Sequence, residues 1–148
     1  EISSSDWSSD VCSSDLPFST RPYQHVLEPL YAYLMIAAMQ YEDGKYAGYY
    51  NVGPDDVDCF QTGALVDLFV RKWGNGMKWV NRYDGGPHEA NFLKLDCAKL
   101  KTTFGWKPHW NLDTAIEKVA EWSKCYLSGG DVRACMDEEI TAFLSAGE

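Results

Sequence analysis

Arg21, Gln24 and His25 carry the side chains in this sequence that are best suited to binding a charged ligand. They lie in STRPYQHVLEPL, residues 19–30, directly before a stretch with helical spacing. A guanidinium at such a point can hold a phosphate through two parallel hydrogen bonds. This chemistry leaves two interpretations open for Arg21: it binds an anionic group, although the chain has a formal net charge of −9, or it is a solvent-exposed loop arginine.

Tyr41 and Lys45 match the Y-x-x-x-K spacing, in which a lysine lowers the pKa of an acid/base tyrosine. That chemistry needs both side chains on one face of a helix. Gly44 falls inside the match, in a polar turn at a predicted helix end. We interpret the match as coincidence.

Other catalytic and metal motifs are missing from the sequence. It contains no G-x-G-x-x-G loop for a dinucleotide and no G-x-S-x-G nucleophile turn. His25, His88 and His109 are far apart, and none has the spacing of a metal-ligand pair. We predict no catalytic residue and no metal site in this chain.

The elements that must position these residues alternate between helices and strands. Helical spacing or capping residues predict helices from Leu27 toward Gly44, over Thr62–Trp73 and Asp96–Phe104, from the N-cap Asn111 to Gly129, and in the tail MDEEITAFLSA. Short strands are predicted over 46–52, 77–81 and 91–95. This alternation indicates an α/β fold, with too few strands for a complete sheet.

Composition limits the class of protein. With 148 residues, 45% of them hydrophobic, the chain should form a globular domain with a sizeable core. The longest apolar stretch, LYAYLMIAAM, is too short to span a membrane, so we expect a soluble protein. Lysine and arginine are dispersed in an acidic chain, which argues against a nucleic-acid partner.

The cysteines indicate the redox environment. They are odd in number and scattered, without a C-x-x-C pair: Cys12, Cys59, Cys97, Cys125 and Cys135. We predict free thiols in a reducing cytoplasm.

Residues 1–16, EISSSDWSSDVCSSDL, differ from the rest of the chain. Ser-Ser-Asp occurs three times in this stretch, which has no basic residue and cannot bury a core. It resembles a translated sequencing adapter, and we interpret it as an artefactual or disordered leader. A natural acidic tail is the alternative. Residues 17–148 are then the domain proper.

Five motifs in order, RPYQHVLEPL, YNVGPDD, PHEANFLKLD, KLKTTFGWKP and WNLDTAIEKVAEW, resemble the carboxyl-terminal part of the CDP-glucose 4,6-dehydratases. These are extended short-chain dehydrogenases/reductases that act on a nucleotide sugar. The resemblance covers about residues 19–146. It implies a Rossmann-type α/β parent whose amino-terminal half binds NAD and is missing from this sequence. The chain would then be the substrate-binding carboxyl-terminal part, inactive alone.

The resemblance also implies roles for individual residues. Arg21 would bind the diphosphate of CDP-glucose, with Gln24 and His25 as supporting residues that orient it or pack beneath the substrate. Asn51 would contact cofactor or substrate, or simply end a strand. His88 and Glu89 fall in the loop that closes over the diphosphate and nucleoside, or face solvent. The full-length parent would be a cytoplasmic homodimer.

Two alternatives remain open. The parent could be a related nucleotide-sugar enzyme, such as a UDP-sugar epimerase or a dTDP-glucose 4,6-dehydratase. Epimerase-like relatives more often have R-D-aromatic at the first motif, so Pro22 after Arg21 favours the CDP-glucose branch. The chain could instead be a non-catalytic binding domain, which the lack of catalytic motifs supports.

Overall fold

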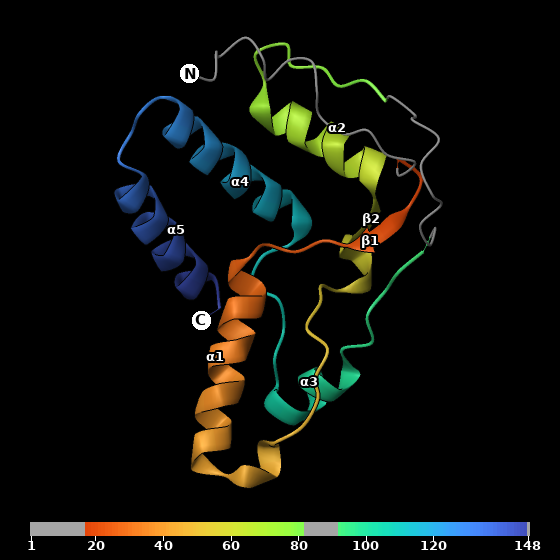
Figure 1. Ribbon diagram of the computed structural model, residues 1–148, viewed down its shortest axis with the longest axis vertical. Helices are drawn as coiled ribbons and strands as arrows, with labels where there is room; N and C mark the ends of the chain where they lie inside the picture. The colour runs from red at the N-terminus through yellow and green to blue at the C-terminus, as the bar shows by residue number, and fades with distance from the viewer. Residues whose placement is uncertain (1–16, 82–91, 148) are drawn as a thin grey trace.

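The computed structural model describes residues 17–81 and 92–147 (Figure 1). This part of the chain is a mixed α/β arrangement in which helices predominate. Its elements, in chain order, are β1 (Thr20–Pro22), α1 (Leu27–Glu42), the 3-10 turns η2 (Gly44–Tyr46) and η3 (Asp56–Asp58), β2 (Cys59–Gln61), α2 (Thr62–Trp73), α3 (Ala98–Phe104), α4 (Leu112–Leu127) and α5 (Val132–Ala146).

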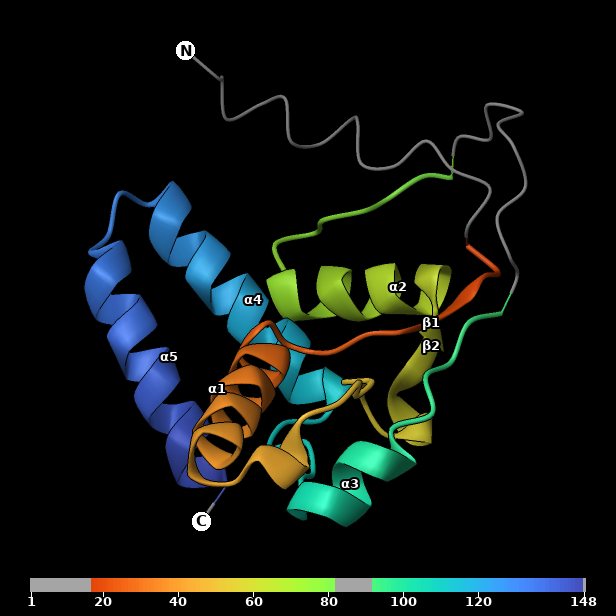
Figure 2. The same cartoon turned by 60° about the horizontal axis from the view of Figure 1, so that its bottom comes forward.

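Three of the helices pack in series. α2 lies against α4, and α4 lies against α5, as both views of the ribbon show (Figures 1 and 2). Leu68 of α2 is buried, as are Ala115 and Ala120 of α4. The small alanine side chains let neighbouring elements approach α4 closely.

The main core lies between α1, α3 and the chain that follows each of them. Ala32, Leu100 and Trp106 are almost completely buried there. Partly buried hydrophobic side chains surround these three residues: Tyr31, Met35, Ile36, Tyr50, Val52 and Phe104. Burial of this apolar surface holds α1 against α3.

A two-stranded antiparallel sheet joins the beginning of the described chain to the start of α2. Arg21 of β1 pairs with Phe60 of β2, and an isolated parallel bridge pairs Thr20 with Phe92. Neither strand was predicted from the sequence. Each has only three residues, and β1 contains Pro22, so no alternating pattern marks them. They form because the helices bring residues about 40 positions apart together.

The helix predictions are confirmed with small shifts. α2 has the predicted bounds, and the side chain of Asn111 caps α4 by accepting a hydrogen bond from the Thr114 amide at 3.0 Å. Asp96 lies just before α3 and accepts from the Ala98 amide at 2.9 Å, so the helix begins two residues later than predicted. α5 begins at Val132, earlier than the tail motif indicated.

The strand predicted over 46–52 is wrong. Tyr46 ends the turn η2, and its carbonyl oxygen accepts a hydrogen bond from the Tyr50 hydroxyl at 2.8 Å. The carbonyl oxygen of Tyr49 accepts from Lys99 Nζ at 3.1 Å. Side chains therefore donate hydrogen bonds to carbonyl groups that, in a strand, would accept them from the backbone of a neighbouring strand.

The other two predicted strands are also corrected. Residues 77–81 form no regular element, and Trp79 instead donates its indole N–H to Asp67 of α2 at 2.8 Å. Of the strand predicted over 91–95, residue 91 lies outside the described residues, and the rest contributes only the bridge from Phe92 to Thr20.

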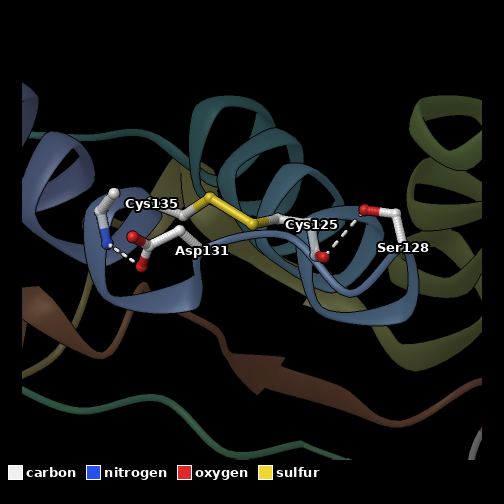
Figure 3. The surroundings of a disulfide bond; sticks show 5 residues. Cys125, Ser128, Asp131 and Cys135 are labelled. Atoms are coloured by element: carbon white, nitrogen blue, oxygen red, sulfur yellow. Dashed lines mark hydrogen bonds between the residues drawn. A yellow bond between two sulfur atoms is a disulfide. The ribbon is translucent and has the colours of Figure 1, made fainter.

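The prediction of free thiols is wrong for two cysteines, because Cys125 and Cys135 form a disulfide (Figure 3). Although ten positions apart in sequence, they meet because α4 and α5 turn back on each other. Cys59 and Cys97 are free thiols, and Cys12 lies outside the described residues. None of the helices described here is long and apolar enough to cross a membrane.

Candidate functional site

Arg21 lies at a junction of three chain segments. It is the middle residue of β1, half-buried, and its Nη1 donates to the carbonyl oxygen of Thr20 at 3.0 Å. The same oxygen accepts the backbone N–H of Leu93, also at 3.0 Å. The guanidinium and the Leu93 amide therefore converge on one oxygen, which places Lys94, the next residue, in the same neighbourhood.

A mixed polar cavity of about 480 Å³ begins at this segment. Its lining residues come from the chain before η3, from the segment 94–97 and from α3: Pro54, Asp56, Lys94, Leu95, Asp96, Cys97, Ala98 and Lys101. Lys94 Nζ lies 3.4 Å from an oxygen of Asp56, and Lys101 forms an ion pair with Asp55. Because these carboxylates are exposed, an anionic ligand can compete for the lysines.

Sequence reasoning missed Lys94 and Lys101. Both belong to motifs that carry the family resemblance, PHEANFLKLD and KLKTTFGWKP, but neither lysine was given a binding role. Two lysines seven positions apart carry no local signal of a shared cavity. The fold brings both lysines to one cavity, at the point where the 94–97 segment leads into α3.

Asn51 does not line the cavity but contacts Asp96, which does. Its side chain is exposed, and Nδ2 donates to the carbonyl oxygen of Asp96 at 3.0 Å. Gly53 follows two residues later, and a Cβ added there would lie 3.1 Å from Leu95 and 3.3 Å from the sulfur of Cys97. This close approach lets 51–54 run along the 95–97 segment.

Gln24 is hydrogen-bonded to the same segment, 51–54. Its Nε2 donates to the carbonyl oxygen of Val52 at 3.3 Å, next to Asn51. Its Oε1 is buried without a hydrogen-bond partner among the described residues. A buried acceptor of this kind calls for a donor, which water or the hydroxyl group of a ligand can supply. The structure thus brings Gln24 and Asn51 to neighbouring points.

His25 has a different environment. It is buried, its Nδ1 accepts from the Leu27 amide at 3.3 Å, and its Nε2 lies 2.9 Å from Glu139 of α5. Nδ1 is thus the acceptor, and Nε2 carries the proton that is donated to the carboxylate. Desolvation by burial lowers the pKa of His25 and raises that of Glu139. His25 therefore joins the start of α1 to α5.

The remaining candidates do not add to the site. Burial raises the pKa of Cys97, which keeps its thiol protonated and a poor nucleophile. Tyr41 is exposed near the end of α1, whereas Lys45 lies in η2 and pairs with Asp43 at 2.8 Å. His88 and Glu89 lie outside the described residues. Within 17–81 and 92–147, no three His, Cys, Asp or Glu side chains are grouped to hold a metal ion.

The small α/β domain thus has a cavity lined by two lysines, Lys94 and Lys101, while Arg21, Gln24 and Asn51 lie on neighbouring segments outside the lining. The two lysines suit an anionic ligand. No protein-family model matches the sequence. The chain is similar to the CDP-glucose 4,6-dehydratase of Salmonella typhimurium strain LT2, with 39% identity over 131 residues. The match covers 88% of this chain and 36% of that enzyme, so the chain spans about a third of its relative. The predicted resemblance is confirmed.

Proposed function

We propose that this chain forms the nucleotide-sugar binding part of a 4,6-dehydratase that acts on CDP-glucose. The observation that carries the proposal is the 39% identity to a CDP-glucose 4,6-dehydratase over 131 residues. The geometry supports it, since a diphosphate needs cations and a sugar needs hydrogen-bonding groups. Lys94 and Lys101 line the cavity, and Arg21, Gln24 and Asn51 lie on segments close to it.

Each residue has a role in this proposal. Arg21 forms two hydrogen bonds to the diphosphate, while Lys94 and Lys101 add positive charge on the side of α3. Asn51 binds a hydroxyl group of the sugar or ribose, and so does Oε1 of Gln24, which has no hydrogen-bond partner among the residues that the structure describes. His25 acts indirectly, by fixing the start of α1. His88 and Glu89 are proposed to close over the nucleoside.

NAD is the cofactor we propose for the whole enzyme, and the described residues do not fit a site for it. The sequence has no Gly-rich loop at a helix start, and Tyr41 and Lys45 lie in different elements. We therefore assign this chain substrate binding and no step of the hydride chemistry. Homodimerisation and a cytoplasmic location are proposed for the whole enzyme on the same resemblance.

The test is a titration of the chain with CDP-glucose, followed by amide chemical shifts in NMR spectra. We expect shifts at Arg21, Asn51 and the 94–101 segment, with weaker effects from UDP-glucose and dTDP-glucose. Tighter binding of either competitor would favour a related nucleotide-sugar enzyme. No shift in these segments at millimolar CDP-glucose would refute the proposal.

Turnover is the second readout. We expect the isolated chain with NAD to form no product from CDP-glucose, because Tyr41 and Lys45 lie in different elements and the sequence has no Gly-rich dinucleotide loop. The non-catalytic binding-domain alternative shares that expectation, so the choice between the two depends on the ligand. A domain outside this enzyme class has no reason to prefer CDP-glucose over UDP-glucose.

A further inference from the structure

The disulfide between Cys125 and Cys135 joins the last turn of α4 to the first turn of α5 (Figure 3). Both cysteines are half-buried, so a small thiol reagent can reach them. The loop between the helices is short and is held by its own hydrogen bonds. Ser128 donates to the Cys125 carbonyl oxygen at 2.9 Å, and Asp131 caps α5 by accepting from the Ala134 amide at 3.0 Å.

α5 is packed unevenly along its length. Phe143 is its one buried residue, with ring contacts to Tyr31, His109 and Trp110. The carboxylate of Glu139, near the middle of α5, accepts a hydrogen bond from Nε2 of His25. The first turns contain only half-buried or exposed side chains. At that end of α5, therefore, the disulfide is the strongest attachment to α4.

An apolar groove of about 400 Å³ lies beside this weakly packed half of α5. Met136, Glu139 and Ile140 form its wall on α5, and Val119 and Trp122 form its wall on α4. The start of α1 provides the third side. A movement of the first turns of α5 away from α4 would widen this groove and expose apolar surface.

We propose that the Cys125–Cys135 disulfide is a redox switch that holds the amino-terminal half of α5 on α4 and limits the width of this groove. Two molecules of a low-molecular-weight thiol such as glutathione open the switch. They supply two electrons and two protons, the S–S bond becomes two cysteine thiols, and the reductant becomes its own disulfide. The proposal is independent of the proposed function.

Reduction is expected to loosen the docking of α5 without unfolding the helix. The Asp131 cap and the Phe143 contacts do not involve the disulfide, so helix content should stay constant. Removing the covalent link returns conformational freedom to the first turns. Hydrogen exchange at residues 132–138 should therefore become about tenfold faster or more.

The experiment compares the full chain in glutathione disulfide with the same chain in a dithiol reductant. Hydrogen exchange is measured by mass spectrometry at 132–138, with α2 as the internal reference. Binding of an apolar fluorescent dye reports on the groove. We expect faster exchange and more dye binding in the reduced chain, with unchanged far-UV circular dichroism.

Two variants make the test specific. Cys135→Ser should show the fast exchange under both conditions, whereas Cys59→Ser, which removes a free thiol, should respond like the wild type. Equal exchange at 132–138 in both redox states of the wild type would overturn the proposal, even if a variant fails to fold. It would also be overturned if thiol counting shows that the pair stays reduced in glutathione disulfide.

Discussion

Glu28 stabilises the connection between α3 and α4 through a single carboxylate oxygen. The residue is completely buried, and its Oε1 accepts the backbone N–H groups of His109 at 2.9 Å and Trp110 at 2.8 Å. Burial raises the pKa of Glu28, and the two hydrogen bonds oppose that rise. One buried acidic side chain thus satisfies two amides that belong to no helix or strand.

Glu28→Ala should lower the free energy of unfolding by about 2–4 kcal/mol, because it leaves two buried N–H groups without an acceptor. Urea denaturation followed by tryptophan fluorescence measures this loss. Glu28→Gln keeps an oxygen at the same position and is the matched control, with a clearly smaller loss expected. Equal losses in the two variants would show that the hydrogen bonds are not the cause.

The His25–Glu139 pair predicts how stability depends on pH. Burial lowers the folded pKa of His25 below its ordinary value of 6.5, so between the folded pKa and 6.5 the unfolded chain binds more protons. The contribution of His25 to stability is therefore complete above about pH 6.5 and is lost as the pH falls toward its folded pKa. Glu139, with a raised pKa, contributes in the opposite sense: its burial costs stability as the pH rises above about 4.5.

The urea midpoints of unfolding at pH 7.5 and pH 6.0 test the contribution of His25 to stability. The pKa of Glu139 is raised from a lower ordinary value, 4.5. The wild type should be less stable at pH 6.0, and His25→Gln should lose much of that difference. A variant with the full wild-type pH dependence would assign the effect to other groups.

Arg21 is the residue on which the binding proposal depends most. Arg21→Ala should weaken CDP-glucose binding by about 10- to 150-fold, which corresponds to roughly 1.5–3 kcal/mol for a charge-assisted contact. Arg21→Lys keeps the charge but lacks the planar guanidinium that makes two parallel hydrogen bonds, so its loss of affinity should be smaller than that of Arg21→Ala but still measurable. Isothermal titration calorimetry measures both.

Arg71, exposed on α2, provides the control for net charge. Arg71→Ala changes the charge of the chain as Arg21→Ala does, but it should leave CDP-glucose affinity unchanged. Similar losses in both alanine variants would mean that Arg21 acts through long-range electrostatics and does not contact the ligand.

At the scale of elements, the sequence predicts what local interactions determine. Asn111 and Gly105 act within a few residues of the helix ends that they mark, so α3 and α4 could be located without tertiary information. β1 and β2 form only through pairing across about 40 residues. The site shows the same dependence on tertiary structure. The local motif RPYQH was enough to identify Arg21, whereas Lys94 and Lys101 could be recognised as cavity residues only in the folded chain.

The start of α4 has two caps of different kinds, which gives a prediction at this scale. Asn111 is exposed and accepts from the Thr114 amide, whereas Asp58 of η3 is buried and accepts from the Leu112 amide at 2.9 Å. Asn111→Ala should lower the free energy of unfolding by about 1 kcal/mol. Asp58→Ala should cost more, about 1–3 kcal/mol, because water cannot easily reach the buried amide.

Thermal and urea denaturation of both variants checks this order. Asn111→Ser keeps a capping oxygen and is the matched control, with near-wild-type stability expected. A larger loss for Asn111→Ala than for Asp58→Ala would show that burial of the amide is not what sets the cost.

For the whole molecule, the outer face of α1 is the feature that the described packing leaves unexplained. α1 is apolar around most of its circumference, and Tyr33 and Leu34 are 57% and 73% exposed. A helix of this composition is typical of one that is covered on several sides. Tyr41, farther along the helix, is also exposed. The described packing buries the side of α1 that faces α3, the Trp106 segment and Phe143 of α5.

The chain should therefore self-associate through α1 at concentrations of tens of micromolar, as exposed apolar patches favour. Sedimentation velocity measures this association. Leu34→Glu should shift the chain toward monomer without lowering the free energy of unfolding, because Leu34 packs little within the chain. Val57→Glu is the matched control: Val57, in η3, is 79% exposed and receives the same charge, so its substitution should leave the association intact. If both variants dissociate equally, added negative charge on an already acidic chain is the cause, and the face of α1 is not a contact surface.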